Sequence, residues 1–189
     1  MKLLREILYK VEINSVIGNT SLSINKIEFD SRLISDGDMY IAITGVNVDG
    51  HSFISQAIQN GANCIVCEKI PDNKTDGVVY VNVKSSRKAL AIISSNYFDN
   101  PSSKLNLIGV TGTNGKTTIA TLLFDLYTEL EIKSGLISTV KISYDNKNFQ
   151  ANQTTPDSLS INRFLSEMVN SNVRYCFMEV SSHGIDQNR

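Results

Sequence analysis

A lysine follows a glycine-bearing turn in the segment Gly112-Thr113-Asn114-Gly115-Lys116-Thr117-Thr118. Glycines in such a turn let backbone N–H groups point inward around phosphate oxygens. The lysine offers a positive charge to the β- and γ-phosphates, and the hydroxyl that follows can bind Mg²⁺. The spacing therefore predicts an ATP-binding site formed by these seven residues, with Thr117 as a metal ligand: Gly112, Thr113, Asn114, Gly115, Lys116, Thr117 and Thr118.

The elements on either side of the turn favour the same interpretation. The apolar run Leu105–Val110 is typical of a buried strand. After the turn, apolar residues recur at helical spacing on one stripe, at Ile119, Leu122, Leu123, Leu126, Tyr127 and Leu130. The turn is therefore expected at a helix N-terminus, where free N–H groups and the helix dipole favour anions. It is shorter than the common phosphate loop, because Val110 stands where that pattern has its first glycine.

A second polar cluster, Ser181-Ser182-His183-Gly184, follows the expected strand Val173–Val180, which carries Glu179 near its carboxyl end. An acid at the carboxyl end of a parallel strand, in the same sheet as a phosphate loop, is placed to hold Mg²⁺. We therefore predict Glu179 as a metal ligand; the alternative is a solvated strand-end glutamate. His183 is expected to orient a phosphate or to support another ligand, with direct metal binding as the alternative. The candidate catalytic residues are Lys116, Glu179 and His183.

Composition and charge narrow the class of protein. The chain has 189 residues, 41% of them hydrophobic, and a net charge of −1, which is typical of a globular protein of one or two domains. This charge indicates neither nucleic-acid nor anionic-membrane binding. The apolar runs are far shorter than the roughly 20 residues of a membrane span, and the N-terminus turns polar before a secretory signal could form. We expect a cytoplasmic protein without membrane insertion.

The three cysteines form no disulfide framework. Cys64-Ile65-Val66-Cys67 has the spacing of a redox or metal motif. The run reads instead as a short buried strand, on which residues three apart point to opposite faces. These two cysteines and Cys176 are therefore predicted to be small core residues.

The order of elements predicts two α/β domains. Residues 1–100 are expected to form a small mixed α/β domain, with strands at Ile24–Phe29, Met39–Ile43, Asn63–Cys67 and Val78–Val83, a turn at Asp36–Asp38, and helices around Phe53–Ile58 and from Ser85-Ser86 to Tyr97. A polar, proline-broken linker leads into residues 101–189. This second part is predicted to be part of a doubly wound parallel sheet with ligands at the strand carboxyl ends. Its further elements are a strand at Gly135–Val140, a hairpin around Tyr144–Lys147 and a helix at Ser158–Asn170.

Two shorter segments admit a purely structural explanation. In Thr154-Thr155-Pro156-Asp157, Asp157 or Thr155 can cap the following helix, which does not exclude ligand contact by the threonine hydroxyls. Asp30-Ser31-Arg32 reads as a turn after a strand.

Together these segments resemble the Mur ligases of bacterial peptidoglycan synthesis, and in particular the branch that forms the tripeptide. The short phosphate loop Gly109–Thr118, the Asp30–Arg32 turn, the Thr154–Asp157 run and the Met178–Gln187 run carry the resemblance. They extend over essentially the whole chain, in the order that the family has them. The resemblance implies an N-terminal domain that binds the UDP substrate, followed by a central ATP-binding domain that is present only in part.

The resemblance also assigns substrate-binding residues. Those that match positions holding the UDP-muramoyl dipeptide are Phe29, Ser31, Val46, Asn47, Val48, Gln153, Thr154, Thr155, Ser181, Gln187 and Arg189. Phe29 and Val46 depart from the residues most common there.

The implied reaction is amide formation driven by ATP with Mg²⁺. The D-glutamate carboxylate of UDP-N-acetylmuramoyl-L-alanyl-D-glutamate attacks the γ-phosphate to give an acyl phosphate. The amine of a diamino acid, meso-diaminopimelate or L-lysine, then displaces phosphate. Lys116 would neutralise charge while the loop fixes the in-line geometry. The family enzyme has three domains and this chain corresponds to its N-terminal portion, so we expect that it does not complete ligation alone. We also expect a monomer.

Three alternatives stay open. The ligase that acts next in the same pathway also has an aspartate–hydroxyl–arginine segment, but its phosphate loop and post-strand motif differ. Folylpolyglutamate synthase shares the nucleotide chemistry without this N-terminal domain. From a different class, the chain could be a binding module that holds a UDP-sugar or ATP without catalysis.

Overall fold

The computed structural model describes residues 1–45, 48–151 and 154–189. The chain divides into two compact units, Met1–Tyr97 and Phe98–Arg189. This division falls three residues before the boundary predicted at 100/101. Each unit has its own sheet and its own buried core.

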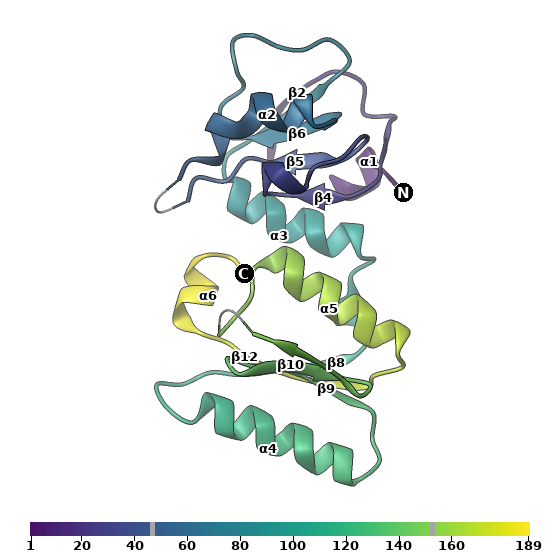
Figure 1. Ribbon diagram of the computed structural model, residues 1–189, viewed down its shortest axis with the longest axis vertical. Coiled ribbons are helices and arrows are strands. Elements are labelled where there is room, and N and C mark those ends of the chain that lie inside the picture. The colour runs from purple at the N-terminus through teal and green to yellow at the C-terminus, as the bar shows by residue number, and fades with distance from the viewer. Residues whose placement is uncertain (46–47, 152–153) are drawn as a thin grey trace. The chain divides into compact units, whose positions relative to one another are not determined.

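The first unit is built on a five-stranded sheet in the order β2-β7-β6-β5-β4. Strands β4 to β7 run parallel, and β2 is antiparallel to β7. Figure 1 shows α2 on one face of this sheet and α3 on the other. The bounds are β1 Lys2–Leu3, α1 Leu4–Ile7, β2 Ile13–Ile17, β3 Ser23–Ile24, β4 Ile27–Glu28, 3₁₀ turn η1 Ser31–Leu33, β5 Met39–Ile41, η2 Gly50–Phe53, α2 Ile54–Gln59, β6 Cys64–Cys67, β7 Val79–Val83 and α3 Ser86–Tyr97.

The predicted strand Ile24–Phe29 is wrong as a single element. It is divided into β3, which pairs with β1, and β4, which pairs with β5. The turn predicted at Asp36–Asp38 is present, with Gly37 at φ +79° and the Asp38 N–H bonded to the Ser35 carbonyl at 3.2 Å. It does not close a hairpin, because β4 and β5 are parallel and η1 also lies between them. The elements before Ser23 lack a strong hydrophobic period and were not predicted.

The prediction of core cysteines is confirmed. Cys64, Cys67 and Cys176 are free and fully buried. Burial raises the pKa of the Cys67 thiol to about 11 and that of Cys176 to about 12, and it raises the pKa of Cys64 as well. Such thiols behave as small apolar core residues.

The second unit has a mixed five-stranded sheet in the order β11-β10-β9-β12-β8. Strands β9, β12 and β8 are parallel, whereas the hairpin β10–β11 adds an antiparallel edge. The predicted α/β fold is confirmed, with this antiparallel edge as an addition to the parallel sheet. The bounds are η3 Pro101–Ser103, β8 Asn106–Val110, α4 Lys116–Glu129, β9 Ser134–Ile137, β10 Lys141–Tyr144, β11 Lys147–Gln150, α5 Ser158–Asn170, β12 Tyr175–Glu179 and α6 Ser182–Asp186.

Helices α4 and α5 cover opposite faces of this sheet (Figure 1). Adjacent residues of β12 show why, because Cys176 belongs to the core under α5 and Phe177 to the core under α4. The α4 residues in that core are Ala120, Leu123, Phe124 and Tyr127.

The apolar stripe predicted on α4 is therefore only partly a packed face. Leu123 and Tyr127 pack on the sheet, whereas Ile119, Leu122 and Leu126 are about half exposed or more, as is Leu130 just after the helix. The periodicity identified the helix correctly but placed the face that meets the sheet about one position away.

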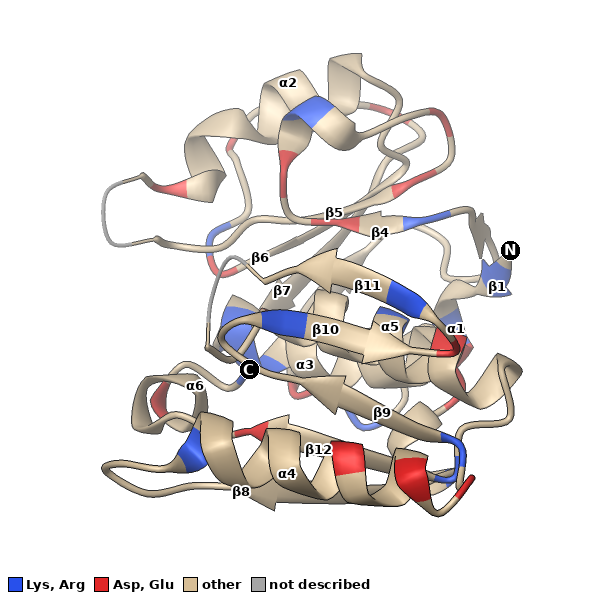
Figure 2. Cartoon of the chain, turned by 60° about the horizontal axis from the view of Figure 1, so that its bottom comes forward, with Lys and Arg blue, Asp and Glu red and all other residues tan. Residues whose placement is uncertain are grey.

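Charged residues of both signs are interspersed over the elements of each unit (Figure 2). This matches the net charge of −1. None of the helices in the described part of the chain has the length and hydropathy of a membrane span.

Candidate functional site

The phosphate loop connects β8 to α4, as predicted. Gly112 has φ +149° and Gly115 has φ +79°, a backbone region that glycine enters without steric cost. Gly115 is also the N-cap of α4, and its carbonyl accepts the N–H of Ile119 at 2.9 Å. Residues 111–115 are exposed. The first turn of a 14-residue helix thus opens toward an exposed glycine loop, an arrangement that favours bound anions.

Lys116 is the first residue of α4, and its side chain folds back over the loop. Its Nζ donates to the carbonyl oxygens of Gly112 at 2.7 Å and Thr113 at 3.3 Å. The ammonium therefore lies against the backbone of the loop, within reach of any anion that the loop would hold. Thr117 follows it, partly exposed.

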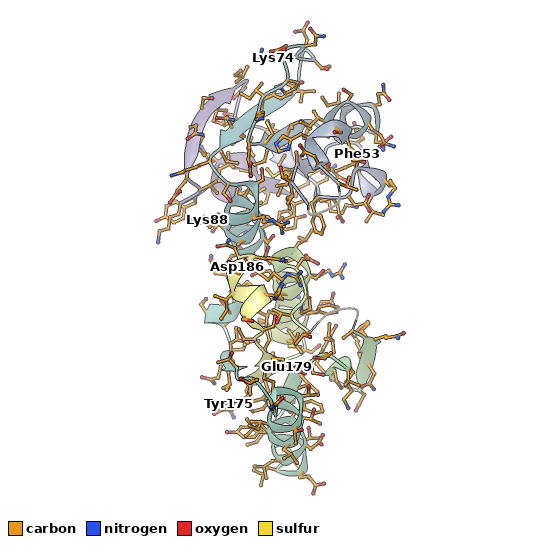
Figure 3. All side chains as sticks on the ribbon, turned by 90° about the vertical axis from the view of Figure 1, so that its left-hand side faces the viewer. Phe53, Lys74, Lys88, Tyr175, Glu179 and Asp186 are labelled. Carbon is orange, nitrogen blue, oxygen red and sulfur yellow. The ribbon has the colours of Figure 1, made fainter. Side chains whose placement is uncertain are left out.

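Glu179 lies at the same edge of the sheet as the loop. It is the last residue of β12 and pairs with Val110, the last residue of the neighbouring parallel strand β8. Figure 3 labels Tyr175 and Glu179, the first and last residues of β12. The predicted placement of an acid beside the phosphate loop is thus found in the structure.

The Glu179 side chain is not solvated, contrary to the strand-end alternative. It is fully buried, and both carboxylate oxygens accept hydrogen bonds from Thr139 in the turn after β9. The Thr139 amide donates to Oε1 at 2.8 Å and its hydroxyl to Oε2 at 3.0 Å. Sequence reasoning missed Thr139, because a Ser-Thr pair after a strand is no motif by itself.

Thr155 joins the substrate-side candidates to the end of β12. Its hydroxyl lies 3.0 Å from the Glu179 carbonyl oxygen and 3.2 Å from Ser181 Oγ, and it accepts the Ser181 N–H at 3.0 Å. Arg189 donates to the Thr155 carbonyl at 2.7 Å, and its guanidinium also binds Gln187 Oε1. The structure therefore brings Thr155, Ser181, Gln187 and Arg189 together. Thr154 is the partly exposed neighbour of buried Thr155.

The capping explanation for the Thr154–Asp157 segment is confirmed. Asp157 is the N-cap of α5, and its Oδ1 accepts the Ser160 N–H at 2.8 Å. Gln153 lies outside the described residues.

His183 is exposed on the short helix α6. Among the hydrogen bonds of the described residues, none joins its ring to Glu179 or Lys116. Ser181 is the N-cap of this helix, and its hydroxyl accepts the Gly184 N–H at 3.0 Å.

The donor set near the loop suits Mg²⁺. A carboxylate from Glu179 and a hydroxyl from Thr117 are oxygen ligands of the kind that this ion takes, usually together with water and substrate phosphates. Within residues 1–45, 48–151 and 154–189, no three His, Cys, Asp or Glu side chains gather as a metal site.

The candidate residues of the first unit also lie at strand carboxyl ends. Phe29 and Ser31 follow β4, and Val48 lies in the loop after the parallel strand β5. Phe29 and Val48 are exposed, whereas Ser31 is buried and its hydroxyl donates to Gln56 Oε1 at 3.0 Å. Val46 and Asn47 lie outside the described residues.

Asp30 behaves as the turn interpretation predicts. It caps η1 by accepting the Arg32 N–H at 3.0 Å, and its carboxylate also accepts from the Arg32 guanidinium. These bonds hold the pKa of the Asp30 carboxyl below its usual range.

A histidine network supports the loop that contains Val48. His51 Nδ1 lies 2.7 Å from Asp49 Oδ1, and His51 Nε2 accepts the Glu68 N–H at 2.9 Å. These partners assign the proton to Nδ1 of a neutral ring. Hydrogen bonds from the His51 backbone N–H and from its Nδ1 also hold the pKa of the Asp49 carboxyl below its usual range. Sequence reasoning did not single out His51, whose partner Glu68 follows a different strand.

Comparisons with known proteins identify both units. The sequence profile "Mur ligase family, catalytic domain" matches residues 23–98, and the profile "Mur ligase middle domain" matches residues 110–189. The UDP-N-acetylmuramoyl-L-alanyl-D-glutamate--2,6-diaminopimelate ligase of Cytophaga hutchinsonii is 49% identical over 187 residues, which are 98% of this chain and 38% of that protein. The ligase of the same name from Clostridium tetani is 45% identical over 184 residues, 96% of this chain and 38% of its own length. The chain thus spans about 38% of the length of these relatives.

Solved structures share the fold. A structure of a UDP-N-acetylmuramoyl-L-alanyl-D-glutamate--2,6-diaminopimelate ligase matches with a TM-score of 0.77 at 22% identity, over 99% of this chain and 37% of that one. The MurF ligase of Thermotoga maritima in complex with ADP matches with a TM-score of 0.55 at 24% identity, over 83% of this chain and 32% of its own. At these identities the likeness concerns the fold alone.

Proposed function

The chain belongs to the Mur ligase family, and we propose that it forms the UDP-substrate-binding unit and the ATP-binding loop of an ATP-dependent amide ligase. The substrate proposed is UDP-N-acetylmuramoyl-L-alanyl-D-glutamate, and the amino acid added is 2,6-diaminopimelate. The names of the relatives at 49% and 45% identity support both choices. The observation that carries the proposal is the exposed phosphate loop of β8–α4 with Glu179 beside it on β12.

In this proposal each part of the second unit has a chemical task. The amides at the start of α4 and the Lys116 ammonium bind the nucleotide phosphates. The ammonium then exchanges the carbonyl oxygens of Gly112 and Thr113 for phosphate oxygens. Thr117 and Glu179 would hold Mg²⁺, which when bound would neutralise phosphate charge. Lys116 then also stabilises charge on the transferring group. His183, exposed on α6, would meet substrate from the solvent side.

The glutamyl end of the substrate is assigned to the cluster around Thr155. Arg189 has a planar guanidinium suited to a carboxylate or phosphate, and Gln187 and the Thr155 carbonyl orient it. Thr154, Ser181 and Gln153 complete the proposed contacts. The uridine end is assigned to Phe29, Ser31 and the loop residues Val46, Asn47 and Val48.

The experiment is a ligation assay with the dipeptide substrate, ATP, MgCl₂ and radiolabelled diaminopimelate, run on the whole protein and on the 189-residue chain. Tripeptide formation by the whole protein, dependent on ATP, is the expected result. Its absence, with lysine and other diamino acids also inert, would reject the ligase. For the 189 residues we expect substrate binding by calorimetry without turnover, and tripeptide formation by this chain would contradict that part of the proposal.

A further inference from the structure

Both oxygens of the Glu179 carboxylate are held by one residue, Thr139. The Thr139 amide donates to Oε1 at 2.8 Å, and the Thr139 hydroxyl donates to Oε2 at 3.0 Å. Two donors from a single residue fix the plane of a carboxylate as well as its position. The orientation of Glu179 is therefore set by the turn after β9 and not by solvent.

The main chain of Glu179 is held as well. Its carbonyl lies 3.0 Å from the Thr155 hydroxyl, and the residue pairs with Val110 in the parallel ladder. Two threonines from two separate loops thus bind the two ends of one glutamate. Such a residue has little freedom to rotate.

The Thr139–Glu179 contact lies at the edge of the sheet where a ligand would bind. Strands β9, β12 and β8 are parallel neighbours, so the Thr139 turn, Glu179 and the phosphate loop lie at the carboxyl ends of three adjacent strands. Ligands of such sheets bind at this edge. Thr139 itself is exposed, whereas the carboxylate it holds is buried.

We propose that Thr139 is a positioning residue that orients the Glu179 carboxylate toward the Mg²⁺ of a bound nucleotide. A carboxylate offers about four acceptor positions, and Thr139 occupies two of them, which leaves the others for a cation. Partners that orient a metal-binding carboxylate typically account for about 10- to 100-fold in metal affinity. This inference rests on the proposed nucleotide site, so its test must separate the two.

The test compares ADP binding with MgCl₂ and with EDTA, by titration calorimetry, in three proteins. Thr139→Val removes the hydroxyl at nearly constant volume and keeps the amide, while Thr139→Ser keeps both donors. The measured quantity is the ratio of the ADP dissociation constant in EDTA to that in Mg²⁺. We expect this ratio to fall about 10-fold in Thr139→Val and to stay near the unaltered value in Thr139→Ser.

If Thr139 had a purely structural role, its substitution would change ADP binding in EDTA and in Mg²⁺ alike. The ratio of the two dissociation constants therefore isolates the contribution of the cation. Thermal unfolding of each variant confirms that it is folded. A further experiment combines Thr139→Val with Glu179→Gln. We expect the double variant to have the same ratio as Glu179→Gln alone, because Thr139 acts through Glu179.

The outcomes are distinct. A folded Thr139→Val with an unchanged ratio, or a Thr139→Ser that loses as much as Thr139→Val, overturns the role of Thr139 and leaves the nucleotide site standing. ADP binding that is equally tight in MgCl₂ and in EDTA in the unaltered chain also overturns the role of Thr139 and leaves the nucleotide site standing. If the unaltered chain does not bind ADP at all, the proposed function falls and this inference falls with it.

Discussion

Gly184 lies so close to Thr155 that a β-carbon at position 184 would stand 2.9 Å from Thr155 Cγ2 and 3.0 Å from Thr155 Cβ. Both residues are buried, and Thr155 is further held by its bonds to Glu179 and Ser181. The helix that follows β12 can therefore approach the Thr154–Asp157 segment only through a residue without a side chain.

Gly184→Ala is the first prediction. Because Thr155 is β-branched and held by hydrogen bonds, the added methyl must displace it or α6, at a cost of about 1–3 kcal/mol. Urea unfolding of the variant measures the loss. Ser182→Ala, an exposed position on the same helix, serves as the control and should stay within about 0.5 kcal/mol of the unaltered chain. Equal midpoints for both variants would mean that the contact is not tight.

The Asp30–Arg32 pair predicts a pH dependence. The side-chain hydrogen bond from Arg32 is the main reason why the pKa of Asp30 lies below its ordinary 3.8. A lowered acid pKa gives stability that is present above that ordinary value and is lost as the pH falls through the lowered one. Arg32→Ala should thus lower the urea midpoint slightly at pH 7, and this deficit should shrink as the pH falls below 3.8.

The size of this effect is small because the Arg32 side chain is 80% exposed. Lys84→Ala, which removes an exposed cation elsewhere in the same unit, is the control. A deficit in Arg32→Ala that persists unchanged at low pH would show that the ion pair is not its cause.

The parts of the fold and of the site that could be predicted from the sequence are those determined by residues close together in the chain. The strand, glycine turn and helix around Lys116 were predictable because apolar runs and glycines act within a few residues, and α5 has the bounds Ser158–Asn170 that its pattern predicted. The parallel pairing of β4 with β5 was not, because short apolar runs do not report strand direction. Neither was the Thr139–Glu179 contact, whose partners are 40 residues apart in the chain.

His51 provides a third prediction. Its Nε2 is the acceptor for the Glu68 N–H, so His51→Ala leaves that amide without its partner. Hydrogen exchange at the Glu68 amide should accelerate strongly, while exchange at Ile65 within β6 stays slow. Unchanged protection at Glu68 would contradict the assigned bond.

The cysteines provide a fourth prediction. All three thiols are fully buried, and burial raises their pKa values, so the reactive thiolate is scarce at neutral pH. An aromatic disulfide reagent at about pH 8 should leave the folded chain unlabelled and label all 3 cysteines in guanidinium chloride. Rapid labelling of the folded chain would mean that β6 or β12 opens readily.

The central claim, that the β8–α4 loop binds nucleotide phosphates through Lys116, is tested most directly by calorimetric titration of ADP with MgCl₂ into Lys116→Met. Loss of a charged hydrogen-bond donor to phosphate predicts binding at least about 10-fold weaker than in the unaltered chain. Lys104→Met, the same change at an exposed lysine just before β8, should bind ADP as the unaltered chain does. Equal ADP affinity in Lys116→Met and the unaltered chain would contradict the account.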